Sequence, residues 1–179
     1  MNYLPDVTSS ASIQSVVLHT ATNHDFLDVL ISNAGITSLA QPLLSQLHET
    51  FETNTFGPAV LIEAMAGLLQ KSREARVIFV SSELGSIGKR VDRNYMFGAI
   101  DAMVSKAALN MLAVCFAKSS ESWETPAKIW CYDPGLVKNR EKLGARSSEA
   151  GGQGLVPIVE GQRDCDTRKL VNDSGTLLW

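Results

Sequence analysis

The stretch AIDAMVSKAALNML at residues 99–112 predicts the helix on which the interpretation of this fold depends. From Ser105 onward it is dominated by Ala and Leu and contains no Gly, Pro or β-branched residue, a composition that favours an α-helix. Lys106 is the only cation in this otherwise apolar run. Ala102 precedes it by one helical turn on the same face, because residues four apart stack along an α-helix. The surroundings of Lys106 are therefore the first thing to establish in the structure.

The composition of the chain is that of an ordinary globular domain. Its 179 residues are 45% apolar and 20% charged. A domain of this length buries roughly 70% of its unfolded surface without a metal or a disulfide as support. The net charge of −3 provides no electrostatic reason to expect nucleic acid or an anionic membrane as a partner. We therefore expect one domain over residues 1–179 that binds neither.

The cysteines and histidines indicate free side chains rather than bridges or metal ligands. The cysteines are odd in number and widely spaced, as expected of reduced thiols in a reducing compartment. The histidines have no metal-ligand spacing, so no metal site is expected. No signal peptide opens the chain and no uninterrupted apolar run approaches the roughly 18 residues of a membrane span, which favours a cytoplasmic protein. These residues are Cys115, Cys131, Cys165, His19, His24 and His48.

Buried strands and long helices alternate along the chain. Residues 28–31, 76–81 and 128–132 are apolar on consecutive positions, which is typical of parallel strands buried on both faces. Such an alternation predicts an α/β fold with a parallel sheet. The helices are expected at 11–23, 47–70, with a kink at Gly57-Pro58, and from 99 to about 119.

The remaining segments are shorter or more polar. Residues 3–7 are expected to end a short strand, and residues 168–171 to form the last one. Residues 82–98 and 138–154 are rich in Gly and charged residues and are expected to be loops. The chain should then end in a packed Leu177-Leu178-Trp179.

Five short motifs occur in the order and context of one family. Together they resemble the short-chain dehydrogenase/reductase family, in the style of its fungal and insect carbonyl-reductase-like members. The resemblance runs from about Asp6 to Trp179 and implies a three-layer, Rossmann-like α/β domain. The motifs are SNAGI at 32–36, TNTFG at 53–57, VSSELG at 80–85, SKAALN at 105–110 and DPG at 133–135.

The resemblance also implies roles for individual residues. Asn54 matches the helix residue that holds a water of the proton relay. Ser82 matches the serine that hydrogen-bonds the substrate carbonyl, and Lys106 the lysine that binds the nicotinamide ribose and lowers the pKa of a catalytic tyrosine. The positions that line the cofactor groove in the family are matched by Asp6, Asn33, Ala34, Gly35, Pro134 and Gly135.

Two departures from the family pattern bear on activity. Ala102 stands where the family carries the catalytic tyrosine, and alanine has no proton to donate. Tyr95 and Asp133 are the substitutes to consider. The chain also contains no GxxxGxG turn, which would offer a helix N-terminus to the pyrophosphate. Met1 falls inside the family's third strand, so the first two strand–helix units, on the order of fifty residues, are expected to be missing.

These departures lead to an expectation of no cofactor, with NADP(H) as the alternative. The first hypothesis is a cofactor-independent isomerase, cyclase, dehydratase or lyase. It would act on an apolar, carbonyl-containing small molecule in secondary metabolism, with Ser82, Lys106 and Asn54 as catalytic residues. The second is a non-catalytic protein that binds a ligand or partner. The third is a residual NAD(P)-dependent oxidoreductase whose missing cofactor site is supplied by another subunit.

Structural alternatives apply to the same residues. Ser82 could cap a turn, and Asn54 could bond the helix backbone near Gly57. Lys106 could be solvated or paired with Glu83 or Asp101, and Asp133 could be an ordinary turn residue.

The loss of two strands would also expose a sheet edge at residues 28–31. We expect either residues 3–7 or another subunit to pair there. A homodimer is expected through the helices that hold 47–70 and 99–118, which dimerise in the family.

Overall fold

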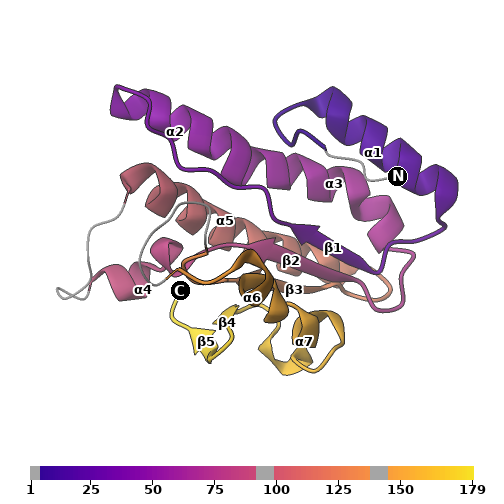
Figure 1. The fold of residues 1–179 in the computed structure, drawn as a ribbon. Helices are drawn as coiled ribbons and strands as arrows, with labels where there is room; N and C mark the ends of the chain where they lie inside the picture. Colours follow the sequence, from indigo (N-terminus) through magenta and orange to yellow (C-terminus); the bar gives the residue numbers. More distant parts are fainter. Residues whose placement is uncertain (1–4, 92–98, 138–144) are drawn as a thin grey trace.

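A single five-stranded sheet organises the chain, which a computed structural model describes at residues 5–91, 99–137 and 145–179 (Figure 1). The strands follow one another across the sheet in sequence order, and only the last one runs antiparallel to its neighbour. The Rossmann-like α/β fold with a parallel sheet is therefore confirmed. The strands are β1 (Val29–Ser32), β2 (Arg76–Val80), β3 (Lys128–Tyr132), β4 (Leu170–Asn172) and β5 (Gly175–Leu177).

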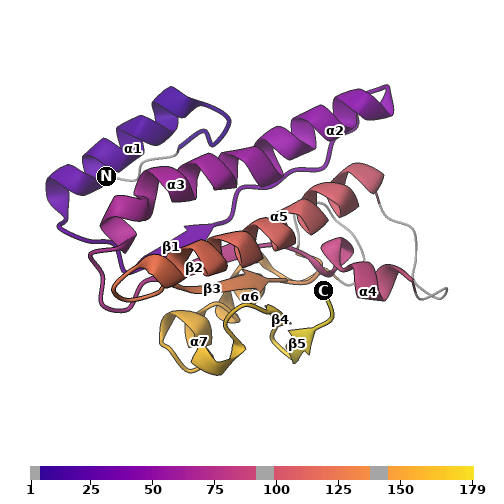
Figure 2. The same cartoon turned by 180° about the vertical axis from the view of Figure 1, so that it is seen from behind.

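Helices cover both faces of this sheet and complete three layers. The long helices α1, α3 and α5 lie on one face, whereas the short α6 and α7 lie on the other, as Figures 1 and 2 show from opposite sides. The α-helices are α1 (Ser10–Asn23), α2 (Leu43–Phe51), α3 (Gly57–Leu69), α4 (Ile87–Arg90), α5 (Ile100–Ser119), α6 (Ser148–Gln153) and α7 (Val156–Val159). Single turns of 3₁₀ helix occupy Glu83–Gly85, Ser120–Ser122 and Asp164–Asp166.

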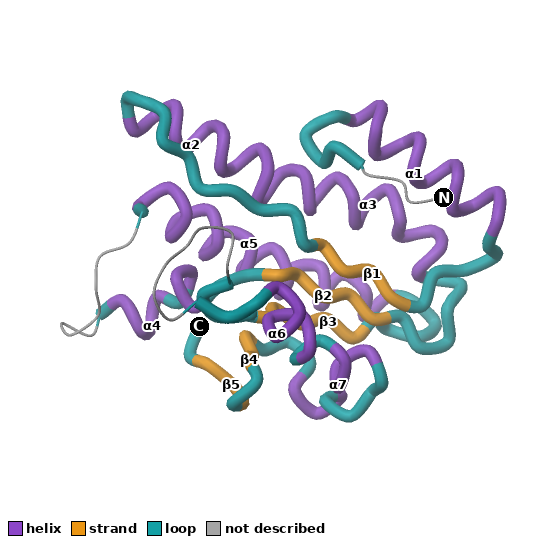
Figure 3. The backbone as a smooth tube through the Cα atoms, in the orientation of Figure 1, coloured by secondary structure: helices purple, strands orange, loops and turns teal. Residues whose placement is uncertain are grey.

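The irregularity predicted at Gly57-Pro58 is a turn of π-helix. It spans Glu52–Phe56 and joins α2 to α3 without a loop, so that the three pieces form one continuous rod (Figure 3). Pro58 lies in the first turn of α3, and because it has no backbone N–H it cannot donate a hydrogen bond to the preceding turn of the rod. The extra residue of a π-turn often marks a functional site in a helix, and here the turn contains the fully buried Asn54.

The core has two parts, one on each face of the sheet. The larger part fills the space between the sheet and α1, α3 and α5, and includes Leu69, Phe79 and Leu109. The smaller part lies under α7 and includes Trp130 and Ile158. Successive residues of β2 and β3 point into opposite parts, which is why both strands are apolar at consecutive positions.

The strand expected to end within residues 3–7 is not seen at the described positions 5–7. Asp6 instead lies in the turn that precedes α1, where its carboxylate accepts hydrogen bonds from the backbone N–H and the hydroxyl of Thr8. Val7 packs on the rod, so closely that a Cβ at Gly57 would lie 2.9 Å from the Val7 Cβ. Of the described residues, none pairs with the outer edge of β1, because the chain before α1 is held against α3.

The segment expected as a loop at 82–98 contains two short helices, so that prediction is wrong over part of its length. Ser82 caps the 3₁₀ turn and Ser86 caps α4, while residues 92–98 lie outside the described chain. Four-residue helices with glycine have too little apolar periodicity to be seen in a sequence. The C-terminus was expected to be packed, but Leu178 is 66% and Trp179 40% exposed. A backbone contact holds the end of the chain, since the N–H of Gly88 donates to the Trp179 carbonyl at 2.6 Å.

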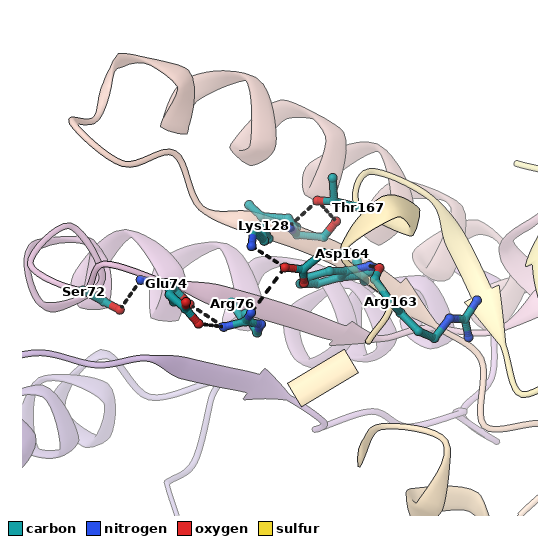
Figure 4. Close-up of polar contacts among 9 residues, drawn as sticks. Ser72, Glu74, Arg76, Lys128, Arg163, Asp164 and Thr167 are labelled. Atoms are coloured by element: carbon teal, nitrogen blue, oxygen red, sulfur yellow. Dashed lines mark hydrogen bonds and ion pairs between the residues drawn. The ribbon is translucent and has the colours of Figure 1, made fainter. Parts of the chain in front are cut away.

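An ion cluster ties the segment after α7 to the first residues of β2 and β3 (Figure 4). The Asp164 carboxylate lies between Arg76, at 3.4 Å, and Lys128. Only 7% of the Arg76 side chain is exposed, and its second partner, Glu74, is largely in solvent. Solvent screens the Glu74 charge, so Asp164 is the carboxylate that compensates most of the positive charge of the buried Arg76 guanidinium.

Helix α5 has the length and apolar composition of a membrane span. Its position in the fold accounts for that composition, because Leu109, Ala113 and Ala117 are buried in the larger part of the core. Core helices of globular domains have this character.

Candidate active site

Lys106 on α5 lies with its ammonium group at the carboxyl end of β2. Its Nζ donates to the Val80 carbonyl at 2.7 Å. Burial lowers the pKa of Lys106 to about 8, against a smaller opposing effect of the Cys131 thiol. The predicted pairings with Glu83 and Asp101 do not form. Glu83 binds Lys89 at 2.6 Å, and Asp101 accepts from the Ser38 N–H.

The lowered pKa of Lys106 gives the protein a pH-dependent stability that can be measured. Folded Lys106 loses its proton near pH 8, whereas the unfolded side chain keeps it up to about pH 10.5. The unfolded state then binds more protons, so the free energy of unfolding should rise by up to about 1 kcal/mol between pH 8 and 9. Above pH 9 the rise should level off, because burial raises the pKa of Cys131 from 9.0 to about 12 and the folded thiol keeps a proton that the unfolded thiol loses. A decline should follow only above about pH 10.5, where the unfolded lysine loses its proton as well.

Urea unfolding at several pH values tests this expectation. The Lys106→Met variant should lose the rise between pH 8 and 9 and keep the decline at higher pH. An equal rise in both proteins would show that another group titrates in this range.

Asn54 links the turn after β1 to α5. Its Nδ2 donates to the Ile36 carbonyl at 2.9 Å and to Ser105 Oγ at 3.0 Å, and its Oδ1 accepts from the Ile36 N–H at 2.7 Å. The π-turn of the rod positions this side chain. The alternative that Asn54 bonds the helix backbone near Gly57 is not what these contacts show. Its place in a water relay stays a prediction.

Gly35 brings the turn after β1 against the same group. A Cβ at this position would lie 3.2 Å from Lys106 Nζ and 3.4 Å from Asn54 Oδ1. Only a residue without a side chain lets the backbone approach the ammonium group this closely. Asn33 and Ala34 precede it in the same turn.

Ser82 follows β2 and is held close to α5. Its Oγ accepts from the Leu84 N–H at 3.1 Å, so the turn-capping alternative holds, while the hydroxyl proton is left for a second partner. A Cβ at Gly85 would lie 2.6 Å from the Lys106 carbonyl carbon. The Ser82 turn therefore packs directly on the backbone of α5 at Lys106.

The turn after β3 forms the third side of this region. Asp133 is buried and accepts from the Gly135 N–H at 3.0 Å. Burial, joined by the negative charge of Glu83, raises its pKa above the usual value. Asp133 thus has the geometry of an ordinary turn residue that also orders Pro134-Gly135.

The other predicted positions are placed less directly. Ala102 lies on α5 and is 3% exposed. Tyr95 lies outside the described residues. Asp6 lies in the turn before α1. Asp101 was missed from the sequence: it is 1% exposed, and one of its carboxylate oxygens has no hydrogen-bond partner. The signal available was a lone carboxylate at the start of an apolar helix.

Comparison with known proteins agrees with this arrangement. A profile of the short chain dehydrogenase family, adh_short, matches residues 2–149. The chain belongs to the short-chain dehydrogenase family. It is 30% identical over 186 residues to the short-chain dehydrogenase anuI of Penicillium roqueforti, covering 97% of this chain and 73% of that one. It is 28% identical to srdF of Neurospora crassa, of whose length it spans 66%.

A solved short-chain dehydrogenase structure bears on the cofactor. The NADPH-bound carbonyl reductase from chicken fatty liver superimposes with a TM-score of 0.84 at 26% identity, covering 99% of this chain and 76% of that one. The expectation that no cofactor is used is therefore wrong, since such a close structural relative holds NADPH. The absence of one sequence motif was too narrow a basis for that expectation.

The residues present fit the nicotinamide–ribose end of such a cofactor. Gly35 lies against the ammonium of Lys106, and a lysine ammonium is a suitable donor to ribose hydroxyls. Pro134-Gly135 lies at the end of the strand that follows β2 in the sheet.

Proposed function

We propose that the chain is an NAD(P)-dependent oxidoreductase that acts on an apolar, carbonyl-containing small molecule. The observation that carries the proposal is the buried Lys106 ammonium beside Gly35, at the carboxyl ends of β1 and β2, where open α/β sheets bind ligands. Family membership and the NADPH-bound structural relative support it. Kinship with fungal short-chain dehydrogenases favours a role in secondary metabolism.

The chain's own residues would handle the carbonyl oxygen and its proton. The cofactor, when bound, supplies or accepts the hydride. Ser82 can donate its hydroxyl proton to the carbonyl oxygen, and protonated Lys106 is the acid nearest to neutrality in this region, with its pKa of about 8. Ala102 offers no hydroxyl for this step. Protonated Lys106 is thus proposed to take the acid role that the family gives to a tyrosine.

We further propose that another subunit holds the phosphate end of the cofactor. The sequence contains no GxxxGxG turn. Among residues 5–91, 99–137 and 145–179, no strand lies outside β1, so its outer edge is available to a neighbouring polypeptide.

Nicotinamide mononucleotide tests the proposed function, because it contains only the end of the cofactor that this chain would contact. Calorimetric titration should show binding to the purified protein, and Lys106→Met should weaken it by about tenfold, the loss of one charge-assisted hydrogen bond. NADPH should bind the lone chain no more than a few-fold more tightly. Failure of nicotinamide mononucleotide to bind would contradict the proposal.

We propose a homodimer through α3 and α5. Both helices expose apolar side chains on the side away from the sheet, including Val60 at 41%, Val104 at 45% and Met111 at 63%. Val104→Glu would bury a charge in that interface and should give a monomer in light scattering. Leu18→Glu, on the exposed face of α1, is the matched control and should leave the mass unchanged. A monomeric wild-type protein would contradict the proposal.

A further inference from the structure

A hollow of about 480 Å³ lies on the face of the sheet opposite Lys106, among α6, α7 and the β4–β5 turn. The two sites are separated by β3. Cys131 points into the core under α5, close to Lys106, whereas Tyr132 points into the core under α7. The hollow is therefore not part of the candidate active site. Its polar wall contains two arginines, Arg146 and Arg163, and a single carboxylate, Asp173.

Arg146 is held in place by three oxygen atoms. Its guanidinium donates to Asp173 at 2.5 Å, to the Ala150 carbonyl at 2.7 Å and, more weakly, to the Pro134 carbonyl at 3.4 Å. The other Asp173 oxygen accepts from the Tyr132 hydroxyl at 2.7 Å. Partial burial raises the pKa of Asp173, but the hydrogen bonds from Tyr132 and Arg146 outweigh it and keep the pKa below its usual value. Asp173 is therefore ionised at neutral pH and keeps its ion pair with Arg146.

Arg163 reaches the same turn from the other side. Its Nε and Nη2 bind one oxygen of Asp166 at 3.0 and 2.9 Å, and its Nη1 donates to the Asn172 carbonyl at 2.7 Å. Figure 4 shows this side chain extending away from the Asp164 ion cluster. Because the two guanidinium groups bind adjacent residues, Asn172 and Asp173, the turn brings them together. Each of the two keeps N–H groups that these contacts do not use, since a guanidinium has five.

The charges and shape of the hollow select one class of ligand. The cluster around the hollow has three cations, Arg146, Arg163 and Lys169, against two carboxylates, Asp166 and Asp173. This leaves one positive charge, which a single carboxylate neutralises and a doubly charged phosphate would exceed. Guanidinium groups match a planar carboxylate geometrically. Pro157 and the bare backbone of Gly154 and Gly175 provide an apolar wall beside them. A Cβ at Gly154 would lie 1.9 Å from Asp173 Oδ1, so the backbone must lie this close for the wall to form.

We propose that this hollow binds a small organic monocarboxylate, whose carboxylate bridges Arg146 and Arg163 and whose hydrocarbon part lies along Pro157. The proposal does not rest on the proposed function, because the residues that line the hollow differ from those of the candidate active site, although Arg146 contacts the Pro134 carbonyl. It offers the protein a place to sense or carry an organic acid.

Ser174 allows the charge of the wall to be changed without disturbing either arginine. It is exposed and lines the hollow, and only its backbone N–H is used, in a hydrogen bond to Asn172. Hexanoate should bind the wild-type protein in a calorimetric titration, while the uncharged hexanamide should not. Ser174→Glu should weaken hexanoate binding by about tenfold and Ser174→Lys should strengthen it a few-fold, as one added charge near the ligand does at the protein surface.

Three results would overturn the proposal: no heat with hexanoate, equal binding of hexanoate and hexanamide, or equal affinities in the two Ser174 variants. Tighter binding of inorganic phosphate than of hexanoate would also overturn it, since the site would then be a phosphate site. Binding of nicotinamide mononucleotide should be the same in all these proteins, which separates this site from the proposed active site.

Discussion

Replacing Lys106 with methionine is expected to reduce kcat/KM for carbonyl reduction by at least about a hundredfold, the usual contribution of a positioned acid or base. The ammonium group lies at the carboxyl end of β2, buried and bound to the Val80 carbonyl. Methionine keeps the length and much of the packing of the side chain but can neither donate a proton nor bind a ribose hydroxyl. The measurement is steady-state oxidation of NADPH by this chain together with the subunit that is proposed to hold the phosphate end of the cofactor.

Lys118→Met provides the matched control on the same helix. The Lys118 side chain is 77% exposed and pairs only with Glu121, so its loss should change kcat/KM by less than about twofold, as expected of a surface ion pair. Circular dichroism should show the same fold for both variants. Unchanged turnover in Lys106→Met would exclude a catalytic role for this lysine.

Asp164→Ala is expected to lower the free energy of unfolding by about 2–4 kcal/mol, because it leaves a buried guanidinium without its best-shielded partner. Arg76 is 6% exposed and Lys128 shares the same carboxylate. The loss also releases the segment after α7 from the start of β2. Urea unfolding monitored by tryptophan fluorescence measures the change, and Trp130 in the adjacent core is a suitable reporter.

Glu74→Ala tests whether burial is the cause. Glu74 binds the same guanidinium at 3.0 Å but is 69% exposed, so its removal should cost no more than about 1 kcal/mol. Equal losses in the two variants would mean that Asp164 contributes no more than a surface ion pair.

The central part of the fold could be predicted because its signals are local. The strands β2 and β3 are apolar at consecutive positions, and α5 has a composition that only a helix suits. The Gly57-Pro58 kink followed from the chemistry of proline, although its form as a π-turn did not. The chain at 5–7 was misjudged because its position depends on packing against Gly57, a contact between distant parts of the sequence.

The candidate site was predictable as a set of neighbours but not in its hydrogen bonding. The family resemblance assigned Gly35, Asn54 and Lys106 to one site, and the structure brings them into contact. That Ser105 and Ile36 occupy the Asn54 amide could not be read from a pattern, since it depends on side-chain orientation. The hollow between Arg146 and Arg163 is built from four separate segments and had no sequence signal.

The open edge of β1 has a consequence for the behaviour of the protein in concentrated solution. Among the described residues, no strand pairs with the outer edge of Val29–Ser32, and Ile31 is 39% exposed. Such an edge is a template for sheet-to-sheet polymerisation, which many proteins prevent with lysine, proline or a bulge. None of these devices occurs in the VLIS strand. We therefore expect aggregation of the protein to depend on whether that edge is occupied. A partner bound there would protect the chain from aggregation as well as act as a subunit.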